Sequence, residues 1–323
     1  MKIEKVAVIG GGSFGTVIAN IIAGNGHPVS FWMRSGNLAR VINETRENPQ
    51  YLPGHPVHEL VTATKDMGSA VRGSQLVFVA VPSDSFRAVV RLLRHFVSKD
   101  AIMVSTTKGI EARTFFLMSQ VLRQELPGSR VGVLSGPNLA KEIARGDLTG
   151  TVIASDDVDV REAVKDLLKS ENFRVYTNND MFGVELGGSL KNIYAIIAGI
   201  AAAIGMGHNT NSMLVTRALT EMARFARELG ADPMTFLGLS GVGDLVVTCS
   251  TPLSRNYRVG FAIGSGKSIN DALQEIGQVA EGVKTVKLVK EKADELGVYM
   301  PLASGLYRII YEGESIRNII SSL

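Results

Sequence analysis

The chain has 323 residues, of which 45% are hydrophobic and 20% charged, with 34 lysines and arginines against 31 aspartates and glutamates. This composition predicts a soluble globular protein of two domains and excludes a disordered or fibrous chain. The net charge is only +3 and no long basic run occurs, which argues against a nucleic-acid partner, while the single cysteine, Cys249, excludes a disulfide framework and favours a reducing compartment.

Apolar runs alternate with helix-length segments through the first half of the chain. The predicted strands are residues 2–9, 28–33, 60–64, 75–81, 101–105, 130–135, 150–154 and 174–176. Most of these runs are continuously apolar, as in strands that are covered on both faces. The sequence therefore predicts an α/β fold with a Rossmann-type doubly wound, mostly parallel sheet. Because no signal-like segment precedes the first strand, secretion is not expected.

The first predicted strand ends in a glycine-rich turn, residues 10–15 (GGGSFG), and an apolar segment suited to a helix follows. Gly10 permits a sharp turn, Gly12 lets the backbone approach a ligand without a Cβ in the way, and Gly15 allows the helix to pack closely on the strand. The helix N-terminus offers N–H groups and a positive dipole to an anion. This arrangement predicts a dinucleotide pyrophosphate site, with a purely structural turn as the alternative.

The second predicted strand bears on the choice of dinucleotide. In a fold of this type the residue at the end of that strand contacts the adenosine ribose. Here the strand is followed by Arg34, where an Asp or Glu would otherwise stand. A guanidinium attracts a 2′-phosphate, whereas a carboxylate repels it. We therefore expect NADPH to be used at least as well as NADH; the alternative is a solvated surface arginine.

Lys108 directly follows another predicted strand, in the segment 106–111 (TTKGIE). This position places a cation at the carboxyl edge of the sheet, where such folds bind ligands. A lone loop lysine is usually solvated, so the position alone assigns no role.

From residue 181 onward the apolar periodicity is helical only. The predicted helices are residues 182–206, 211–229, 233–237, 268–276, 284–296, 305–312 and 315–323, with a loop over residues 241–256. We expect an all-helical C-terminal domain, residues 185–323, after a dinucleotide-binding domain, residues 1–184. The apolar stretch 193–206 is too short to span a bilayer and is typical of a buried core helix. The cleft between the domains is the expected active site.

Polar residues stand out against this helical background. Lys191 lies at the polar end of an apolar helix, where desolvation and nearby cations would lower its pKa and make it a general base; the alternative is that it snorkels to solvent. In the predicted loop, Asp244 is suited to bond a substrate hydroxyl or to hold Lys191, and Arg255 and Asn256 offer planar donors for a phosphate. His208 is expected in a loop. No metal-ligand spacing and no Ser/His/Asp set is found.

Six motifs occur in a fixed order along nearly the whole chain. They are GGGSFGT at 10–16, TKGIE at 107–111, SGPNLAKE at 135–142, LGGSLKN at 186–192, GVGDL at 241–245 and SRN at 254–256. Together they resemble NAD(P)-dependent glycerol-3-phosphate dehydrogenases of the bacterial type. The resemblance implies reversible reduction of dihydroxyacetone phosphate to sn-glycerol 3-phosphate with NADPH/NADP or NADH/NAD. It also implies a cytoplasmic homodimer that supplies glycerophospholipid synthesis, without membrane insertion.

The resemblance also implies roles for single residues. Lys191 matches the proton acceptor, with Lys108 and Asp244 beside the reacting carbons. The implied substrate contacts are Lys108, Gly136, Asn138, Lys191, Asp244, Ser254, Arg255 and Asn256. The implied dinucleotide contacts are Ser13, Phe14, Arg34, Lys108, Ala140, Arg255, Val279 and Glu281, in addition to the glycines of the turn.

One position departs from the family's usual pattern. The family has Ser or Thr with Phe where this chain has Asn138 and Leu139. An amide still forms hydrogen bonds, so the substrate contact is expected to persist in altered form.

Two other functions remain open on the residues alone. One is a dehydrogenase with a similar two-domain build that acts on a 3-hydroxy acid or a sugar acid, although it would leave residues 254–256 without a role. The other is a nucleotide-sensing module without turnover, although a sensor has no need of two lysines and an aspartate.

Overall fold

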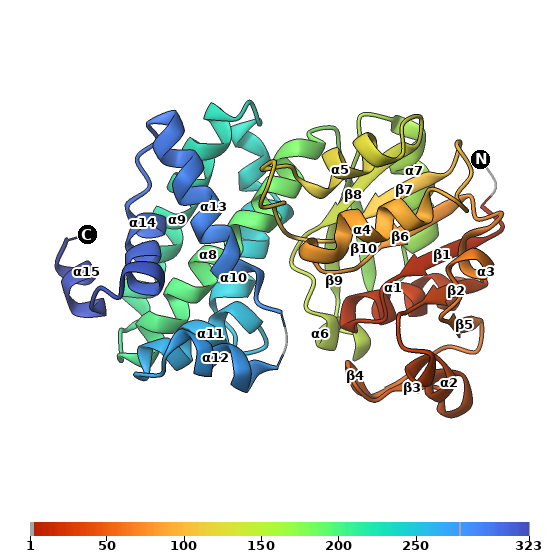
Figure 1. Cartoon of the computed structure of the whole chain (residues 1–323), viewed down its shortest axis with the longest axis horizontal. Helices are drawn as coiled ribbons and strands as arrows, with labels where there is room; N and C mark the ends of the chain where they lie inside the picture. Colours follow the sequence, from red (N-terminus) through yellow and green to blue (C-terminus); the bar gives the residue numbers. More distant parts are fainter. Residues whose placement is uncertain (1–2, 278, 323) are drawn as a thin grey trace. The chain divides into compact units, whose positions relative to one another are not determined.

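The computed structural model describes residues 3–277 and 279–322. The chain divides into two compact units (Figure 1). The first contains Met1–Thr107 and Phe116–Met181, and the second contains Lys108–Phe115 and Phe182–Leu323. The expected boundary after residue 184 stays a prediction, and the short segment Lys108–Phe115 joins the second unit although the first unit surrounds it in sequence.

The first unit is built on a sheet whose strands were all predicted. They are β1 (Val6–Ile9), β2 (Val29–Trp32), β5 (Val61–Thr64), β6 (Leu76–Val79), β7 (Ile102–Ser105), β8 (Arg130–Ser135), β9 (Thr149–Ala154) and β10 (Phe173–Asn178). Their spatial order is β10-β9-β8-β7-β6-β1-β2-β5. Neighbouring strands run parallel except β8 and β9. The mostly parallel sheet is therefore confirmed.

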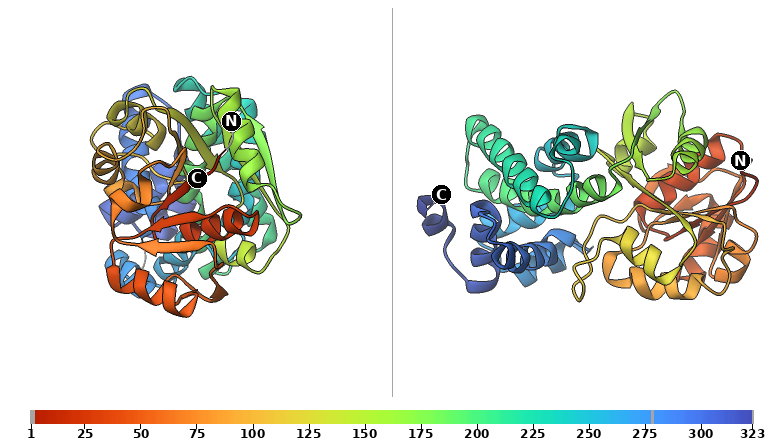
Figure 2. Two further views of the ribbon diagram at one scale, coloured as in Figure 1. Left: turned by 90° about the vertical axis from the view of Figure 1, so that its right-hand side faces the viewer. Right: turned by 90° about the horizontal axis from the view of Figure 1, so that it is seen from above.

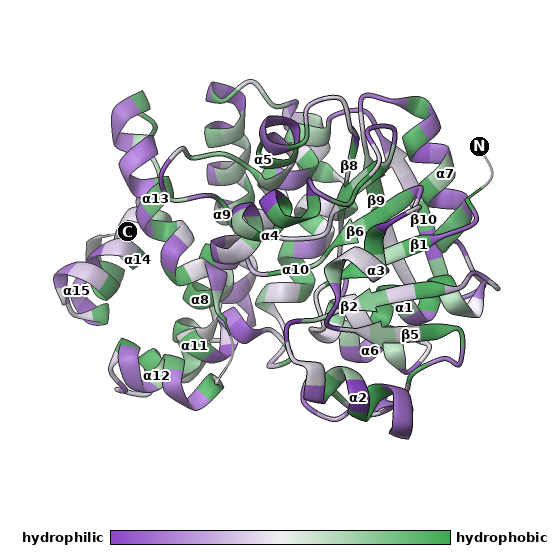
Figure 3. Cartoon of the chain, turned by 45° about the vertical axis from the view of Figure 1, so that its right-hand side comes forward, coloured by the Kyte–Doolittle hydropathy of each residue, from purple (hydrophilic) through white to green (hydrophobic). Residues whose placement is uncertain are grey.

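Helices lie on both sides of this sheet (Figure 2). They are α1 (Ser13–Gly24), α2 (Gly36–Thr45), α3 (Met67–Val71), α4 (Ser83–Leu93), α5 (Met118–Glu125), α6 (Ala140–Ala144) and α7 (Val158–Leu168). Helix α1 packs with α6 and α7, while α4 packs with α3 and α5. Both faces of the central strands are thus covered, which explains why their sequences are continuously apolar (Figure 3).

A small hairpin between α2 and β5 was not predicted from the sequence. It consists of β3 (Glu47–Asn48) and β4 (Leu52–Pro56), which pair antiparallel. Two prolines and a glycine lie within β4, and both residue types are depleted in strands. Only Asn48 and Leu52 of the hairpin strands are fully buried, so no apolar alternation marks it.

The second unit contains helices and no strands among its described residues, as predicted. Its elements are α8 (Met181–Ala203), α9 (His208–Glu228), η1 (Pro233–Leu237), η2 (Leu239–Gly243), α10 (Asp244–Cys249), α11 (Arg255–Gly264), α12 (Ile269–Ile276), α13 (Glu281–Leu296), α14 (Pro301–Tyr307), η3 (Arg308–Glu312) and α15 (Ile316–Ser322). Helix α8 is long and apolar enough to cross a bilayer, but 83% of its most apolar window is buried inside the protein. It is therefore the core helix of this unit.

Two local predictions in this unit are wrong. The expected loop 241–256 is mostly helical, since it contains the end of η2, all of α10 and the start of α11. The glycines there suggested a turn, but a Cβ on Gly241 would lie 2.1 Å from the carbonyl oxygen of Phe236, so close packing requires that glycine. His208, expected in a loop, is the first residue of α9.

Candidate active site

The glycine turn between β1 and α1 has the shape that its sequence predicts. Gly10 has a φ of 126°, and a Cβ there would lie 2.5 Å from the carbonyl oxygen of Ala80. A Cβ on Gly15 would lie 2.0 Å from the carbonyl oxygen of Gly10. Only glycine fits at these two positions, because each lies against backbone.

The same turn leaves room for a ligand at the start of α1. Among the described residues, no atom lies within 4 Å of the position that a Gly12 Cβ would take, and no side chain caps the helix. Uncapped amides at a helix N-terminus, with open space in front of them, suit an anion. These residues therefore fit the pyrophosphate of a dinucleotide.

Three further residues predicted to contact the dinucleotide lie near this turn or at the end of β2. The Ser13 hydroxyl donates to the carbonyl oxygen of Tyr51 at 2.7 Å. Phe14 is partly buried and packs against the core of the first unit. Arg34 is exposed, one residue before Ser35, whose hydroxyl accepts the N–H of Leu38 and caps α2.

A second group of predicted residues lies beyond the carboxyl end of β8. Gly136 has a φ of 150°, and Asn138 is held against β9, because its amide donates to the carbonyl oxygen of Gly150 at 3.3 Å and accepts the Thr151 hydroxyl at 2.9 Å. Ala140 is the first residue of α6. Among the described residues, the hydroxyl of Ser135, the last residue of β8, is the buried side-chain oxygen without a partner.

The three predicted catalytic residues are in contact within the second unit. Asp244 is fully buried at the start of α10 and accepts the Lys108 ammonium at 2.6 Å. Its other carboxylate oxygen accepts the ammonium of Lys191, which lies in the middle of α8. Lys191 is only 7% exposed, so the expectation that it lies at the polar end of its helix is wrong and the snorkelling alternative is excluded.

Lys108 is held in the second unit by the segment that carries it. The Ser189 hydroxyl on α8 donates to the carbonyl oxygen of Gly109 at 3.3 Å. The ring of Phe115 packs edge-on against Phe225 of α9, with 6.2 Å between the ring centres. Lys108 therefore approaches Asp244 because both ends of its segment are anchored on helices of that unit.

The surroundings of Lys191 shift its pKa toward neutral pH. Burial and, to a smaller extent, the charge of Lys108 lower the pKa of Lys191, Asp244 opposes both effects, and the result is a pKa of about 8. The Lys191 ammonium also donates to the Thr248 hydroxyl at 2.6 Å. Cys249 follows Thr248 at the end of α10, and burial raises the pKa of its thiol to about 12. The thiolate, which is the nucleophilic form of a cysteine, is therefore disfavoured.

Two residues of the SRN motif, Ser254 and Asn256, form hydrogen bonds that stabilise the second unit. The Ser254 hydroxyl accepts the N–H of Tyr257 and caps α11. The buried amide of Asn256 donates to Asn192 at 2.9 Å and accepts the N–H of Gly282 at 3.0 Å. Asn256 thereby links α11 to α13 and to the neighbour of Lys191 on α8.

Three more predicted contacts fall at helix starts of this unit. Arg255 is the first residue of α11 and Glu281 the first of α13. Desolvation lowers the pKa of Arg255, and the charge of Glu281 opposes that effect, so the two side chains interact. Val279 is exposed, two residues before α13.

Thr248 and Asn192 are the polar partners that sequence reasoning missed in this cluster. Both are buried, and Thr248 accepts a bond from Lys191 while Asn192 accepts one from Asn256. Thr248 lies four residues after Asp244 on α10, a spacing that puts both on one helix face. That signal was hidden because residues 241–256 were expected to form a loop.

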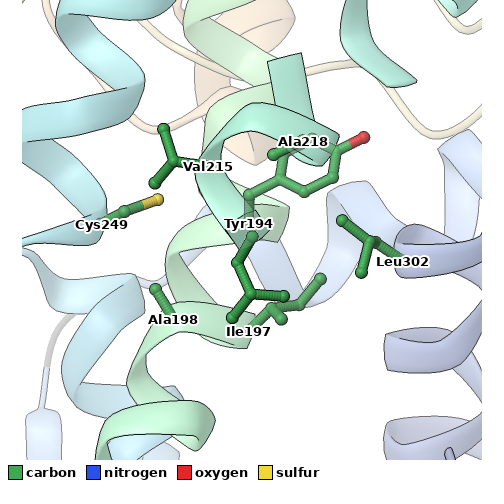
Figure 4. Close-up of a pocket in the computed structure, with 8 residues that line it drawn as sticks. Tyr194, Ile197, Ala198, Val215, Ala218, Cys249 and Leu302 are labelled. Carbon is green, nitrogen blue, oxygen red and sulfur yellow. The ribbon is translucent and has the colours of Figure 1, made fainter. Parts of the chain in front are cut away.

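A small apolar cavity lies in the second unit beside α8 (Figure 4). Its volume of about 10 Å³ suffices for one water molecule at most, so it is no substrate site. It is lined by Tyr194, Cys249, Leu302 and neighbouring aliphatic side chains. The Tyr194 hydroxyl donates to Glu221, which also accepts the N–H of Leu302 at 2.7 Å, so this region fastens α8 to α9 and α14.

Comparison with known families covers both units. Residues 5–161 match the model of the NAD-dependent glycerol-3-phosphate dehydrogenase N-terminus. Residues 180–321 match the model of the NAD-dependent glycerol-3-phosphate dehydrogenase C-terminus. The first match contains the glycine turn, and the second contains Lys191 and Asp244.

Close relatives extend over nearly the whole chain. It is 57% identical to glycerol-3-phosphate dehydrogenase [NAD(P)+] of Saccharophagus degradans, over 98% of this chain and 89% of the relative. It is 54% identical to the enzyme of that name from Teredinibacter turnerae, over 99% and 94%. The crystal structure of glycerol-3-phosphate dehydrogenase from Coxiella burnetii matches with a TM-score of 0.95 and 34% identity, over 99% and 98%. The chain therefore belongs to the NAD-dependent glycerol-3-phosphate dehydrogenase family.

Proposed function

We propose that this chain catalyses the reversible reduction of dihydroxyacetone phosphate to sn-glycerol 3-phosphate with NADPH or NADH. The observation that carries the proposal is the buried cluster of Lys108, Lys191 and Asp244, in a chain that belongs to this family. A ketone reduction needs a proton donor at the carbonyl oxygen, and a cationic environment stabilises the alkoxide as it forms. The cluster offers both.

Lys191 is the proton carrier in this proposal. In the reduction direction its ammonium gives a proton to the oxygen on C2 of the substrate, and in the oxidation direction its neutral amine takes that proton back. Because its pKa is lowered to about 8, both forms are available near neutral pH. Thr248 accepts one ammonium hydrogen and so helps to direct the others.

Asp244 holds the two lysines, and Lys108 supplies charge. The two carboxylate oxygens accept one ammonium each, so neither lysine can turn away without breaking an ion pair. The Lys108 ammonium lies beside the reacting oxygen in this proposal and stabilises the alkoxide there. Its charge also lowers the pKa of Lys191, which favours proton release.

The glycine turn and its neighbours hold the dinucleotide. Gly10, Gly12 and Gly15 shape the pyrophosphate site at the start of α1, and Arg34 attracts the 2′-phosphate of NADPH. When bound, the nicotinamide supplies the hydride to C2 of the substrate. We also assign to the dinucleotide the other contacts that the resemblance implies, namely Ser13, Phe14, Lys108, Ala140, Arg255, Val279 and Glu281.

Arg255 is the main candidate for the substrate phosphate. Asn256, which the sequence places beside it in this role, donates one amide N–H to Asn192 and accepts the N–H of Gly282, and it remains a proposed substrate contact through its second amide N–H. A guanidinium binds phosphate oxygens in pairs and fixes their orientation. The remaining implied substrate contacts, Gly136, Asn138 and Ser254, stay part of the proposal.

The cellular setting follows from the proposed reaction. We propose a cytoplasmic homodimer that inserts into no membrane, binds no nucleic acid and supplies glycerol 3-phosphate to glycerophospholipid synthesis. The buried core position of α8 supports the absence of membrane insertion.

The decisive experiment follows NADPH and NADH absorbance with dihydroxyacetone phosphate and, in parallel, with a panel of 3-hydroxy acids and sugar acids in the presence of oxidised dinucleotide. We expect turnover with dihydroxyacetone phosphate and with none of the hydroxy acids or sugar acids. Turnover only with a hydroxy acid would favour the other dehydrogenase class, and dinucleotide binding without any turnover would favour a sensor.

A further inference from the structure

Asn48, in the hairpin that the sequence did not predict, is fully buried against the glycine turn. Its side-chain amide donates to the carbonyl oxygen of Gly11 at 3.0 Å and to the Thr16 hydroxyl at 2.8 Å. Its carbonyl oxygen accepts the N–H of Tyr51 at 3.3 Å. Both hydrogens of the amide and one lone pair of its oxygen are therefore in use.

The bond to Gly11 orients the peptide that follows it. A trans peptide holds its N–H opposite its C=O. Because the Gly11 carbonyl is turned toward Asn48, the N–H of Gly12 is turned to the opposite side of that peptide. When the direction of an N–H group is set before binding, less conformational entropy is lost on binding and the affinity for the ligand is higher.

The bond to Thr16 orients the next peptide in the same way. The carbonyl oxygen of Gly12 accepts both the N–H of Thr16 at 3.0 Å and its hydroxyl at 2.9 Å. This arrangement directs the N–H of Ser13 out of the N-terminus of α1. Asn48 donates to that same hydroxyl and so fixes its rotation.

The hairpin itself is tied to α1 by further bonds. The Ser13 hydroxyl donates to the carbonyl oxygen of Tyr51 at 2.7 Å. At the far end of the hairpin, the Asn20 amide donates to the carbonyl oxygen of Pro56 at 2.8 Å and accepts the N–H of His58 at 3.0 Å. The position of Asn48 is thus set by contacts on both sides of it.

We infer that Asn48 is a positioning residue for the dinucleotide: together with Thr16 it holds the N–H groups of the glycine turn in the direction that the pyrophosphate requires. This inference deepens the proposed function and rests on its dinucleotide site. Asn48 acts through backbone N–H groups of the turn, and these bind the pyrophosphate, which NADPH and NADH share. A change at Asn48 therefore alters the affinity for NADPH and for NADH by the same factor. It does not touch the proton-transfer cluster, so kcat at saturating dinucleotide is preserved.

The test measures dinucleotide affinity directly, by titrating the full chain with NADPH and with NADH and following nicotinamide fluorescence without substrate. Asn48→Leu keeps the side-chain size and removes its hydrogen bonds. We expect it to raise both Kd values by about tenfold, with kcat at saturating dinucleotide within about threefold of the wild type. A merely structural loss would lower Tm without changing the Kd of the folded protein.

Thr16→Val is the second variant, and it decides the question if Asn48→Leu fails to fold. It removes the hydroxyl and keeps the shape, so both Kd values should again rise, and Thr16→Ser should recover most of the loss. The matched control is Asn43→Ala. It also breaks two side-chain hydrogen bonds in this unit, both to the backbone of Ala63 on β5, but it leaves the turn intact.

The titrations distinguish a role of Asn48 in dinucleotide binding from a general loosening of the first unit. If folded Asn48→Leu, or Thr16→Val in its place, binds both dinucleotides as the wild type does, the inference is overturned. It is equally overturned if Asn43→Ala weakens binding as much, because the effect would then be general loosening. Failure of the wild type to reduce dihydroxyacetone phosphate while these Kd shifts occur would remove the proposed reaction and leave the role of Asn48 standing.

Discussion

Lys191 on α8 and Asp244 at the start of α10 form an ion pair that is almost wholly shielded from solvent. A buried charge needs a partner, and each of these side chains has the other. The carboxylate raises the pKa of Lys191 against the effect of burial, and the balance leaves that pKa at about 8. The ion pair thus permits a lysine in this core and helps to set the pKa of that lysine.

Lys191→Ala removes the proton carrier. We expect kcat for dihydroxyacetone phosphate reduction to fall by about three orders of magnitude, the range in which general acid–base catalysis contributes. Binding of NADPH should persist, because the glycine turn belongs to the other unit. Steady-state rates and a fluorescence titration of NADPH check the two parts, and near-wild-type turnover would remove Lys191 from the mechanism.

The pH dependence should differ in sign between the two directions. Reduction needs the ammonium form of Lys191, so kcat/KM falls as pH rises through about 8; oxidation needs the neutral amine, so kcat/KM rises over the same range. Initial rates between pH 6 and 10 in both directions, in buffers of constant ionic strength, test this. Parallel profiles in the two directions would contradict the assignment.

Asp244→Asn removes the charge that raises the pKa of Lys191. Burial and Lys108 then act unopposed, so the pKa of Lys191 falls further. We expect the pH at which the reduction rate declines to move below that of the wild type, together with a lower kcat. Asp166→Asn is a control, since that aspartate is paired with exposed Lys169 on the surface of the other unit. An unchanged pH profile in Asp244→Asn would contradict the coupling.

Arg34→Glu replaces an exposed cation after β2 by an anion. The carboxylate repels the 2′-phosphate of NADPH and accepts bonds from the ribose hydroxyls of NADH. We expect the ratio of kcat/KM for NADPH to that for NADH to fall by about tenfold or more. Arg40→Glu serves as control, because Arg40 lies on the following helix, α2, and is paired with Glu44. An unchanged ratio in Arg34→Glu would count against the prediction.

Arg255→Ala removes the proposed phosphate clamp. We expect KM for dihydroxyacetone phosphate to rise by about tenfold to a hundredfold, with a smaller effect on kcat, because a bidentate charged contact to the phosphate is lost. The Kd for NADPH is measured beside it, since Arg255 is also a proposed dinucleotide contact. A KM equal to that of the wild type would refute the clamp.

Much of the first unit was predictable because its signals are local. Each strand is a short apolar run that stands out from its flanks, and each of the eight predicted runs overlaps a strand of the sheet. The hairpin of β3 and β4 was missed for the converse reason. Its strands are short, rich in proline and glycine, and stabilised by bonds from Asn48 and Ser13 to distant backbone, which no local pattern records.

In the second unit, too, features with a local sequence pattern were predicted and features that depend on packing were missed. Its helical character followed from periodicity, but Gly241 was taken for a loop residue, whereas it allows η2 to pack closely against Phe236. With α10 unrecognised, the helical spacing of Asp244 and Thr248 carried no meaning. Both side chains face Lys191 because of that helix.

Residue types and their spacing along the chain were enough to predict the strands of the main sheet, most helices, the glycine turn and the family. The burial, the partners and the pKa of Lys191, in contrast, depend on the fold. Its partners Asp244 and Lys108 come from segments remote in sequence, since the positions of Lys108 and Asp244 differ by 136 in the chain. A pKa depends on burial and on nearby charge, and both are properties of the folded core that the order of residues does not state.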